Sequence, residues 1–219
     1  MNTKGNRPKR KVKESNSQRV YSYLLKLLLS KKLVPGDRID RRTVASELGL
    51  SVSPVGEAML RLESEGLLTT VPRKGTLVGI NSKQEAKAAS VIREAFECQA
   101  VRMCCGEPIK ANEKTLIKLA EAVDKAPEGT MTSWKAEMRF HRKIIELAGY
   151  PALTKEFEKV IRRAFFCWVN LLLITHKSKP PGHHTELVKK LKSKNPDYAE
   201  RAMREHLRRG QITLTEHSG

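Results

Sequence analysis

Residues 33–80 read LVPGDRIDRRTVASELGLSVSPVGEAMLRLESEGLLTTVPRKGTLVGI. A Pro-Gly turn at positions 35–36 is followed by a helical pattern over 41–48, whose apolar residues share one face. Gly49 then permits a tight turn before a second helical pattern. The apolar stripe of that second pattern consists of Val55, Met59, Leu62 and Leu67.

The same stretch ends in a predicted β-hairpin. Residues 69–71 and 76–78 favour strands, and Pro72-Arg73-Lys74-Gly75 between them forms a basic tip. Helix, turn, helix and basic hairpin in this order predict a winged helix-turn-helix, which lays one helix in the major groove of double-stranded DNA. With a further helix that begins at Ser17, we expect this unit to span residues 16–80. The alternative is a helix-turn-helix used only for protein contacts.

The charge of the chain suits an anionic partner. The 219 residues carry a formal net charge of +18. Residues 1–80 hold 16 Lys and Arg against 7 Asp and Glu, and residues 81–219 hold 26 against 17. The first part is therefore the more cationic per residue, as expected for a unit that faces phosphates. Residues 1–15, with six Lys and Arg and few apolar side chains, predict a disordered basic arm.

Beyond Asn81 the pattern changes to helices alone. Apolar periodicity predicts helices over 83–105, 112–125, 131–148, 152–175, 183–193 and 196–214. Gly and Pro residues separate them, and the connections are short. We therefore expect a mainly α protein, in which an all-α bundle of six or seven helices fills residues 81–219 behind the amino-terminal unit.

Cysteine spacing and hydropathy favour a cytoplasmic protein. Cys98, Cys104, Cys105 and Cys167 show no C-x-x-C spacing, so we interpret them as reduced core residues. The first residues have no apolar run of the signal-peptide kind. The most apolar segment, AFFCWVNLLLI at 164–174, is too short to span a bilayer and suits a buried helix. No membrane partner is expected.

Four motifs in the amino-terminal unit, PGDRI, TVASELGLS, PVGEAMLRLESEGLL and RKGTLV, resemble the GntR family of bacterial transcription factors. The resemblance covers residues 17–80, and it implies a homodimer on a palindromic operator. Members usually carry two arginines on the recognition helix, where this chain has Val52 and Gly56. Arginine to guanine is the commonest specific base contact, so the operator preference should differ from that of the family. A helical glycine also costs about 0.5–1 kcal/mol relative to alanine.

Several residues are candidates for contacts with DNA. Arg41 and Arg42 stand at a helix start, from which they can reach phosphates, and Arg61 lies on the recognition helix. The wing tip can enter the minor groove, where a glycine lets the backbone approach closely. Ser51 or Ser53 can cap the recognition helix at its DNA-facing end. The predicted DNA-binding set is Arg41, Arg42, Ser51, Ser53, Arg61, Arg73, Lys74 and Gly75.

A second constellation lies in the helical part. Glu137 and His141 are four residues apart and therefore share one face of a helix. His184 and His206 lie on two further predicted helices. One carboxylate and three imidazoles from three helices can converge on a divalent metal. The alternative is that each histidine is a core residue with its own hydrogen bonds.

The spacing D-x-x-x-H, then H-x-x-[IL], then A-M-x-x-H resembles the FCD class of GntR regulators over residues 83–210. That class implies a bundle holding Zn, Ni or Mn through one Asp and three His, with a small carboxylate effector near the metal. Glu137 stands in the position of the usual Asp, a change that bears on metal preference and affinity. Three further histidines, His176, His183 and His217, have no family counterpart and are interpreted as surface residues.

Arg93 aligns with an arginine that this class places toward the effector pocket. A guanidinium suits a carboxylate because it binds in a bidentate manner. The alternative for Arg93 is an ion pair with Glu97, four residues further along the helix.

Together these features predict a DNA-binding transcriptional regulator, a homodimeric repressor whose operator binding responds to a small organic acid. The first alternative is a metalloregulator for which the metal itself is the signal. The second is a metal-dependent enzyme or a storage bundle. An enzyme is not expected, because the sequence offers no second carboxylate at matched spacing and no nucleophile motif.

Overall fold

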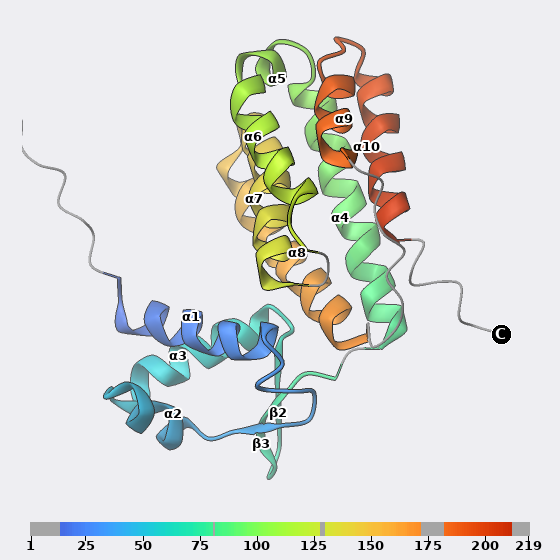
Figure 1. Ribbon diagram of the computed structural model, residues 1–219. Coiled ribbons are helices and arrows are strands. Elements are labelled where there is room, and N and C mark those ends of the chain that lie inside the picture. The colour runs from blue at the N-terminus through green and yellow to red at the C-terminus, as the bar shows by residue number, and fades with distance from the viewer. Residues whose placement is uncertain (1–13, 81, 128–129, 172–181, 212–219) are drawn as a thin grey trace, which may run out of the picture.

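The computed structural model describes residues 14–80, 82–127, 130–171 and 182–211. In Figure 1 the elements from α1 to β3 lie below a bundle of long helices that runs from α4 to α10. The predicted basic arm lies outside the described residues except for its last two, Glu14 and Ser15. The arrangement confirms the predicted mainly α fold, with a helix-turn-helix followed by an all-α bundle.

Three helices build the lower part: α1 (Asn16–Leu29), α2 (Arg41–Leu48) and α3 (Val52–Ser64). The carboxylate of Asp40 caps α2 by accepting a hydrogen bond from the Thr43 amide at 2.9 Å. Gly49 ends that helix in the left-handed conformation, φ +64°, which glycine adopts without strain. This turn sets α3 across α2, with Val55, Ala58, Met59 and Leu62 buried beneath it.

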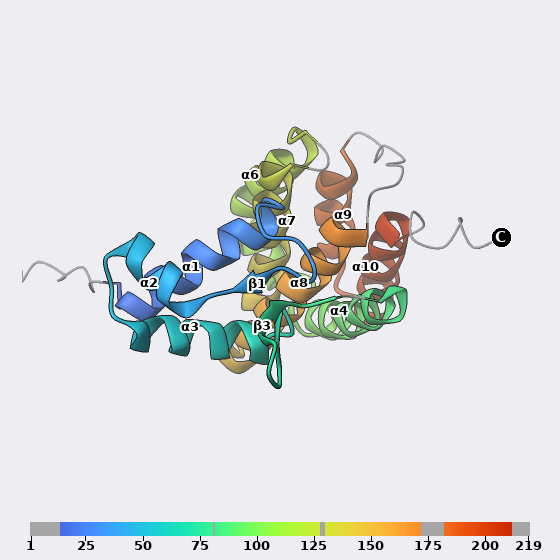
Figure 2. The same ribbon diagram turned by 90° about the horizontal axis from the view of Figure 1, so that it is seen from below.

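The sheet has one strand more than the sequence pattern predicted. The hairpin of β2 (Leu68–Val71) and β3 (Gly75–Val78) is present, and β1 (Arg38–Ile39) pairs with the other side of β3. All pairings are antiparallel, in the order β1-β3-β2. A strand of two residues is too short to produce an alternating pattern, so periodicity did not reveal β1. Figure 2 shows the hairpin projecting beside α3.

Within the described residues, seven helices form the bundle: α4 (Lys83–Cys104), α5 (Glu107–Ala111), α6 (Glu113–Asp124), α7 (Met131–Leu147), α8 (Pro151–Leu171), α9 (His183–Leu191) and α10 (Pro196–Gln211). Six of them match the predicted ranges to within a few residues. The five-residue α5 was not predicted, because it is too short to show a period. No strand occurs among the bundle residues that the structure describes.

The bundle and the lower part pack against each other. The core of the lower part, which includes Val20, Leu24 and Leu62, also takes in Trp134 of α7 and Phe166 of α8. A separate core around Phe140 and Ile144 fills the space between α4, α6, α7, α9 and α10. Within the described ranges, no helix is long and apolar enough to cross a bilayer.

Candidate metal centre and nucleic-acid interface

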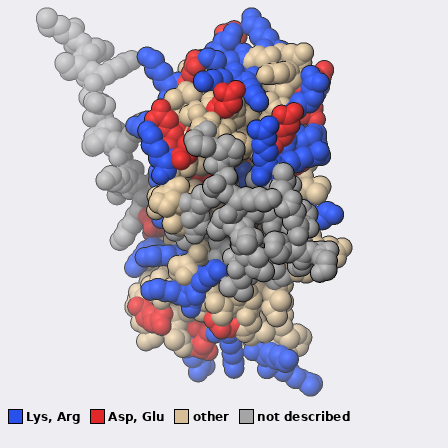
Figure 3. Space-filling view, turned by 45° about the vertical axis from the view of Figure 1, so that its right-hand side comes forward, with Lys and Arg blue, Asp and Glu red and all other residues tan. Residues whose placement is uncertain are grey.

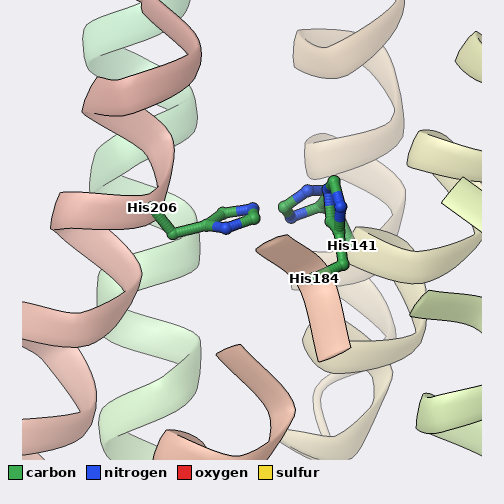
Figure 4. Close-up of side chains that lie close together, drawn as sticks. All are labelled: His141, His184 and His206. Atoms are coloured by element: carbon green, nitrogen blue, oxygen red, sulfur yellow. The ribbon is translucent and has the colours of Figure 1, made fainter. Parts of the chain in front are cut away.

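Three histidines converge inside the bundle. His141 on α7, His184 on α9 and His206 on α10 are all buried, and one nitrogen of each lies within 4.8 Å of the others. Figure 4 shows the three rings pointing toward one another from their helices. Three of the four predicted metal ligands are therefore brought together, although they lie far apart in the sequence.

The fourth predicted ligand, Glu137, stands one helical turn before His141. Its Oε2 lies 3.0 Å from Nε2 of His141, and its Oε1 lies 3.4 Å from Nε2 of His184. The carboxylate thus adjoins two of the three imidazoles. An oxygen and several ring nitrogens gathered at this range form a donor set suited to a divalent transition metal.

Two carboxylates that were not predicted as part of the centre orient these rings from behind. Glu97 of α4 is hydrogen-bonded to Nδ1 of His141, and Asp124 at the end of α6 lies 2.7 Å from Nδ1 of His184. Such partners fix the imidazole tautomer and leave Nε2 for the metal. The sequence pattern indicated Glu97 only as a partner of Arg93, and nothing in the local pattern linked Asp124 to a histidine 60 positions away.

The electrostatics of the centre favour a neutral His206 and an ionised Glu97. Burial, and then the neighbouring His141 and His184, hold the pKa of His206 well below its usual 6.5. Burial acts to raise the pKa of Glu97, but His141 and Arg93 outweigh it and lower that pKa. Neutral imidazole is the form that binds metal, so His206 is in its metal-binding state at neutral pH.

The residues present fit a bound metal. Nδ1 of His206 is buried and has no hydrogen-bond partner in the described part of the chain. An unsatisfied buried polar atom costs about 1–3 kcal/mol, which a metal ligated there would offset. His183, predicted as a surface residue, is instead half-buried and stacks on His206 with ring centroids 4.1 Å apart. His176 and His217 lie outside the described residues.

Arg93 forms the ion pair with Glu97 that was the alternative to an effector contact. Its Nε donates to Glu97 at 2.6 Å, and its Nη2 lies 3.9 Å from Glu137. The side chain is half-buried at the edge of the metal centre. It therefore balances the charge of two carboxylates, and its contact with an effector stays a prediction.

The predicted DNA contacts lie at the lower part of the molecule. Arg41 and Arg42 are exposed on the first turn of α2, and Arg73 and Lys74 are exposed at the hairpin tip. Gly75 has φ +87° and stands against the Arg38 side chain. Figure 3 shows Lys and Arg at this lower end and also over the top of the bundle, so basic charge is not confined to the hairpin end.

The recognition helix presents its serines to solvent. Ser51 is the cap residue of α3, but its side chain makes no cap hydrogen bond. Ser53 is exposed on the first turn.

Arg61 has partners within the chain. Its Nη1 donates to Gln18 at 2.7 Å, and its guanidinium carbon lies 3.8 Å from the ring centroid of Tyr21, both on α1. Its Nε lies 3.4 Å from Glu65. A role for Arg61 in base reading stays a prediction, and the structure adds a role in joining α3 to α1.

Two known protein families match this chain. The FCD domain family matches residues 89–209, and the family of bacterial regulatory proteins called gntR matches residues 16–78. The chain belongs to the GntR family, with an FCD domain. It is a transcriptional regulator of that family.

The relatives match along most of the chain. The HTH-type transcriptional repressor RspR of Escherichia coli K12 is 23% identical over 198 residues, which cover 87% of this chain and 85% of that protein. The regulator YdhC of Bacillus subtilis is 25% identical over 191 residues, or 85% of each chain. Among solved structures, Escherichia coli McbR/YncC has a TM-score of 0.68 at 23% identity, covering 91% of this chain and 97% of that one.

A GntR regulator of Rhodococcus sp. RHA1 has a TM-score of 0.73 at 17% identity, covering 90% and 96%. At these identities the structural likeness concerns the fold alone.

Proposed function

We propose that this GntR regulator binds a palindromic operator as a homodimer and represses transcription until a small organic acid binds beside a divalent metal in the FCD domain. The observation that carries the proposal is the convergence of three buried histidines with Glu137 in the centre of the bundle. Placing four such groups together in a core costs desolvation, which a bound cation offsets.

In this proposal Glu137, His141, His184 and His206 hold Zn, Ni or Mn. The metal, when bound, supplies a Lewis-acidic position that anchors a carboxylate. Arg93 lies at the edge of the centre with its guanidinium 3.9 Å from Glu137, so it is proposed as the second contact for that carboxylate. An effector that displaced Glu137 from Arg93 would alter the contacts between α4 and α7.

DNA binding is assigned to the helix-turn-helix and its wing. Arg41 and Arg42 contact phosphates at the start of α2, and Arg73 and Lys74 of the wing enter the minor groove. Ser51 and Ser53 lie at the exposed amino end of α3, within the part that enters the major groove. All these residues are solvent-exposed in the structure, as binding to an external duplex requires.

A face of α4 is suited to the dimer contact. Five residues at helical spacing on its outer side are exposed and apolar: Ala88, Val91, Ile92, Ala95 and Met103. Val91 is 61% exposed, an unusual state for a branched aliphatic residue in the middle of a long helix. Two copies of α4 packed across a two-fold axis would cover this stripe and place two recognition helices on one palindrome. Repression is proposed because the relative RspR is named a repressor.

The test measures operator affinity in four states: apo protein, protein with metal, protein with a carboxylate from a thermal-shift screen, and protein with both. We expect affinity to fall only when metal and carboxylate are present together. A fall with metal alone would favour the second candidate, a metalloregulator, which the buried histidine cluster also supports. No change in any state would contradict both.

A further inference from the structure

The outer face of the recognition helix carries exposed apolar side chains and no cationic one at the end expected to enter the groove. Val52, Ser53, Gly56, Glu57 and Leu60 follow the one-three-one-three spacing that places residues on one side of a helix. Val52 is 44% exposed and Leu60 is 62% exposed. No Lys or Arg occurs in α3 from position 52 to 60.

The one arginine of α3 makes contacts with α1. Arg61 lies in the last turn, where it donates to Gln18 and stacks on Tyr21 of α1. A guanidinium held by these contacts must give up a hydrogen bond and a cation–π contact before it reaches a base. The first two turns of α3 therefore meet the bases without a guanidinium of their own.

Cationic side chains surround this face instead of lying on it. Arg41 and Arg42 are exposed on α2, and Arg73 and Lys74 are exposed on the wing. Nη1 of Arg41 lies 4.0 Å from the position that a Cβ on Gly56 would occupy. The Arg41 guanidinium, which belongs to α2, therefore lies beside the recognition helix at Gly56. The basic residues on either side match the charged phosphates of a duplex. The exposed apolar side chains of α3 match the apolar part of the floor of its groove.

We propose, on the basis of the proposed operator binding, that α3 reads thymine through its C5-methyl group and that Val52 makes this contact. The thymine methyl is the apolar group that base pairs display in the major groove. A valine packed on guanine or cytosine would leave a polar base edge desolvated and unpaired. The half-site is therefore T·A at the base pair facing the first turn of α3, and Val52 is a specificity-determining residue.

The experiment begins with selection of duplexes from random DNA by the full chain. In the duplex so selected, each thymine is replaced in turn by deoxyuridine, which lacks only the methyl group. We expect one thymine in each half-site at which this replacement weakens binding about fourfold, the effect of one buried methyl-sized group. Val52→Ala should abolish that difference, because it should weaken binding to the selected duplex by a similar factor and leave binding to the deoxyuridine duplex nearly unchanged. Val34→Ala is the matched control, since Val34 is 43% exposed but lies outside α3.

A gain-of-contact variant gives a second readout. Val52→Arg should select guanine where the parent chain selects thymine, because arginine binds guanine N7 and O6 in a bidentate manner. If the selected duplex shows no position sensitive to deoxyuridine, or if Val52→Ala keeps the full sensitivity, the inference is overturned while operator binding stands. If selection enriches no sequence at all, sequence-specific binding itself fails, and the inference fails with it.

Discussion

Arg162 of α8 donates two hydrogen bonds to Glu65, the residue that follows and caps α3, at 2.9 and 3.1 Å. Both side chains are buried, and Glu65 also accepts from the Tyr21 hydroxyl at 2.7 Å. The ion pair joins the recognition helix to a bundle helix that packs on α4 and α7, which carry Glu97, Glu137 and His141. The ion pair therefore connects α3, the helix proposed to read DNA, to the helices that carry part of the candidate metal centre.

Removal of one partner of this ion pair is expected to destabilise the protein strongly. Glu65→Gln leaves the buried Arg162 guanidinium with the more distant Glu158, whose Oε2 lies 3.8 Å from its Nη1. We therefore expect a loss of about 3 kcal/mol in the free energy of unfolding, the lower end of the range for a broken buried pair. Urea denaturation followed by circular dichroism measures it. The double variant Glu65→Gln/Arg162→Gln should lose less than the sum of the two single variants. Additive losses would mean that the two side chains do not act as a pair.

The same cluster predicts a loss of stability at alkaline pH. Burial, and then the hydrogen bond to Glu65, raise the pKa of Tyr21 above its usual 10.0. Because the folded-state pKa is the higher one, the contribution to stability is complete below pH 10 and declines as the pH rises toward the folded value. Urea midpoints compared between pH 8 and 11 should fall less in Tyr21→Phe than in the parent chain. Equal slopes would show that Tyr21 ionises as freely in the folded state as in the unfolded one.

Three of the four cysteines should be slow to react in the native protein. Burial raises the pKa of Cys98 to about 11, of Cys104 to about 12 and of Cys167 to about 11, so little thiolate is present. Cys105 is only half-buried. We expect a thiol-specific chromogenic disulfide at pH 8 to modify Cys105 first, and Cys105→Ser to remove that fast phase. Rapid modification of all four thiols in the native state would contradict the packing of the bundle core.

The wing should contribute to affinity without contributing to sequence choice. Arg73 is exposed at the hairpin tip, where it is proposed to approach the minor groove. Arg73→Ala should weaken binding to selected and random duplexes alike and lower the salt dependence of log K by about one. Fluorescence anisotropy over a salt series measures both. A loss confined to the selected duplex would instead assign base recognition to the wing.

Much of the fold could be predicted from the sequence, because the spacing of apolar residues shows which side of a helix is buried. The apolar stripes of α1, α2, α3 and the longer bundle helices each fill a core that the structure shows. The pattern did not reveal β1 or α5, since two and five residues are too few to display a period.

Part of the candidate site could be predicted in the same way. Glu137 and His141 were linked by their helical spacing, and His184 and His206 joined them as imidazoles on two further predicted helices, a set that the resemblance to a family also implied. Glu97 and Asp124 came only from the fold, because they contact the rings of residues 44 and 60 positions away. Likewise, no local pattern could show that Arg61 lies on Tyr21 rather than toward a base.

The central claim is a metal held by three histidines and a glutamate, and metal content tests it most directly. Chain purified without a histidine tag, reconstituted in turn with Zn, Ni and Mn and then desalted, is analysed by elemental mass spectrometry. We expect about one equivalent of metal per chain, near zero in His184→Ala, and weaker retention in Asp124→Asn, because an outer partner of a ligating histidine typically contributes about 10–100-fold in affinity. The parent chain should also lose melting temperature on chelation, whereas His184→Ala should not. Less than about a tenth of an equivalent in the parent chain after all three reconstitutions would contradict the claim and leave the histidines as the lining of a polar core.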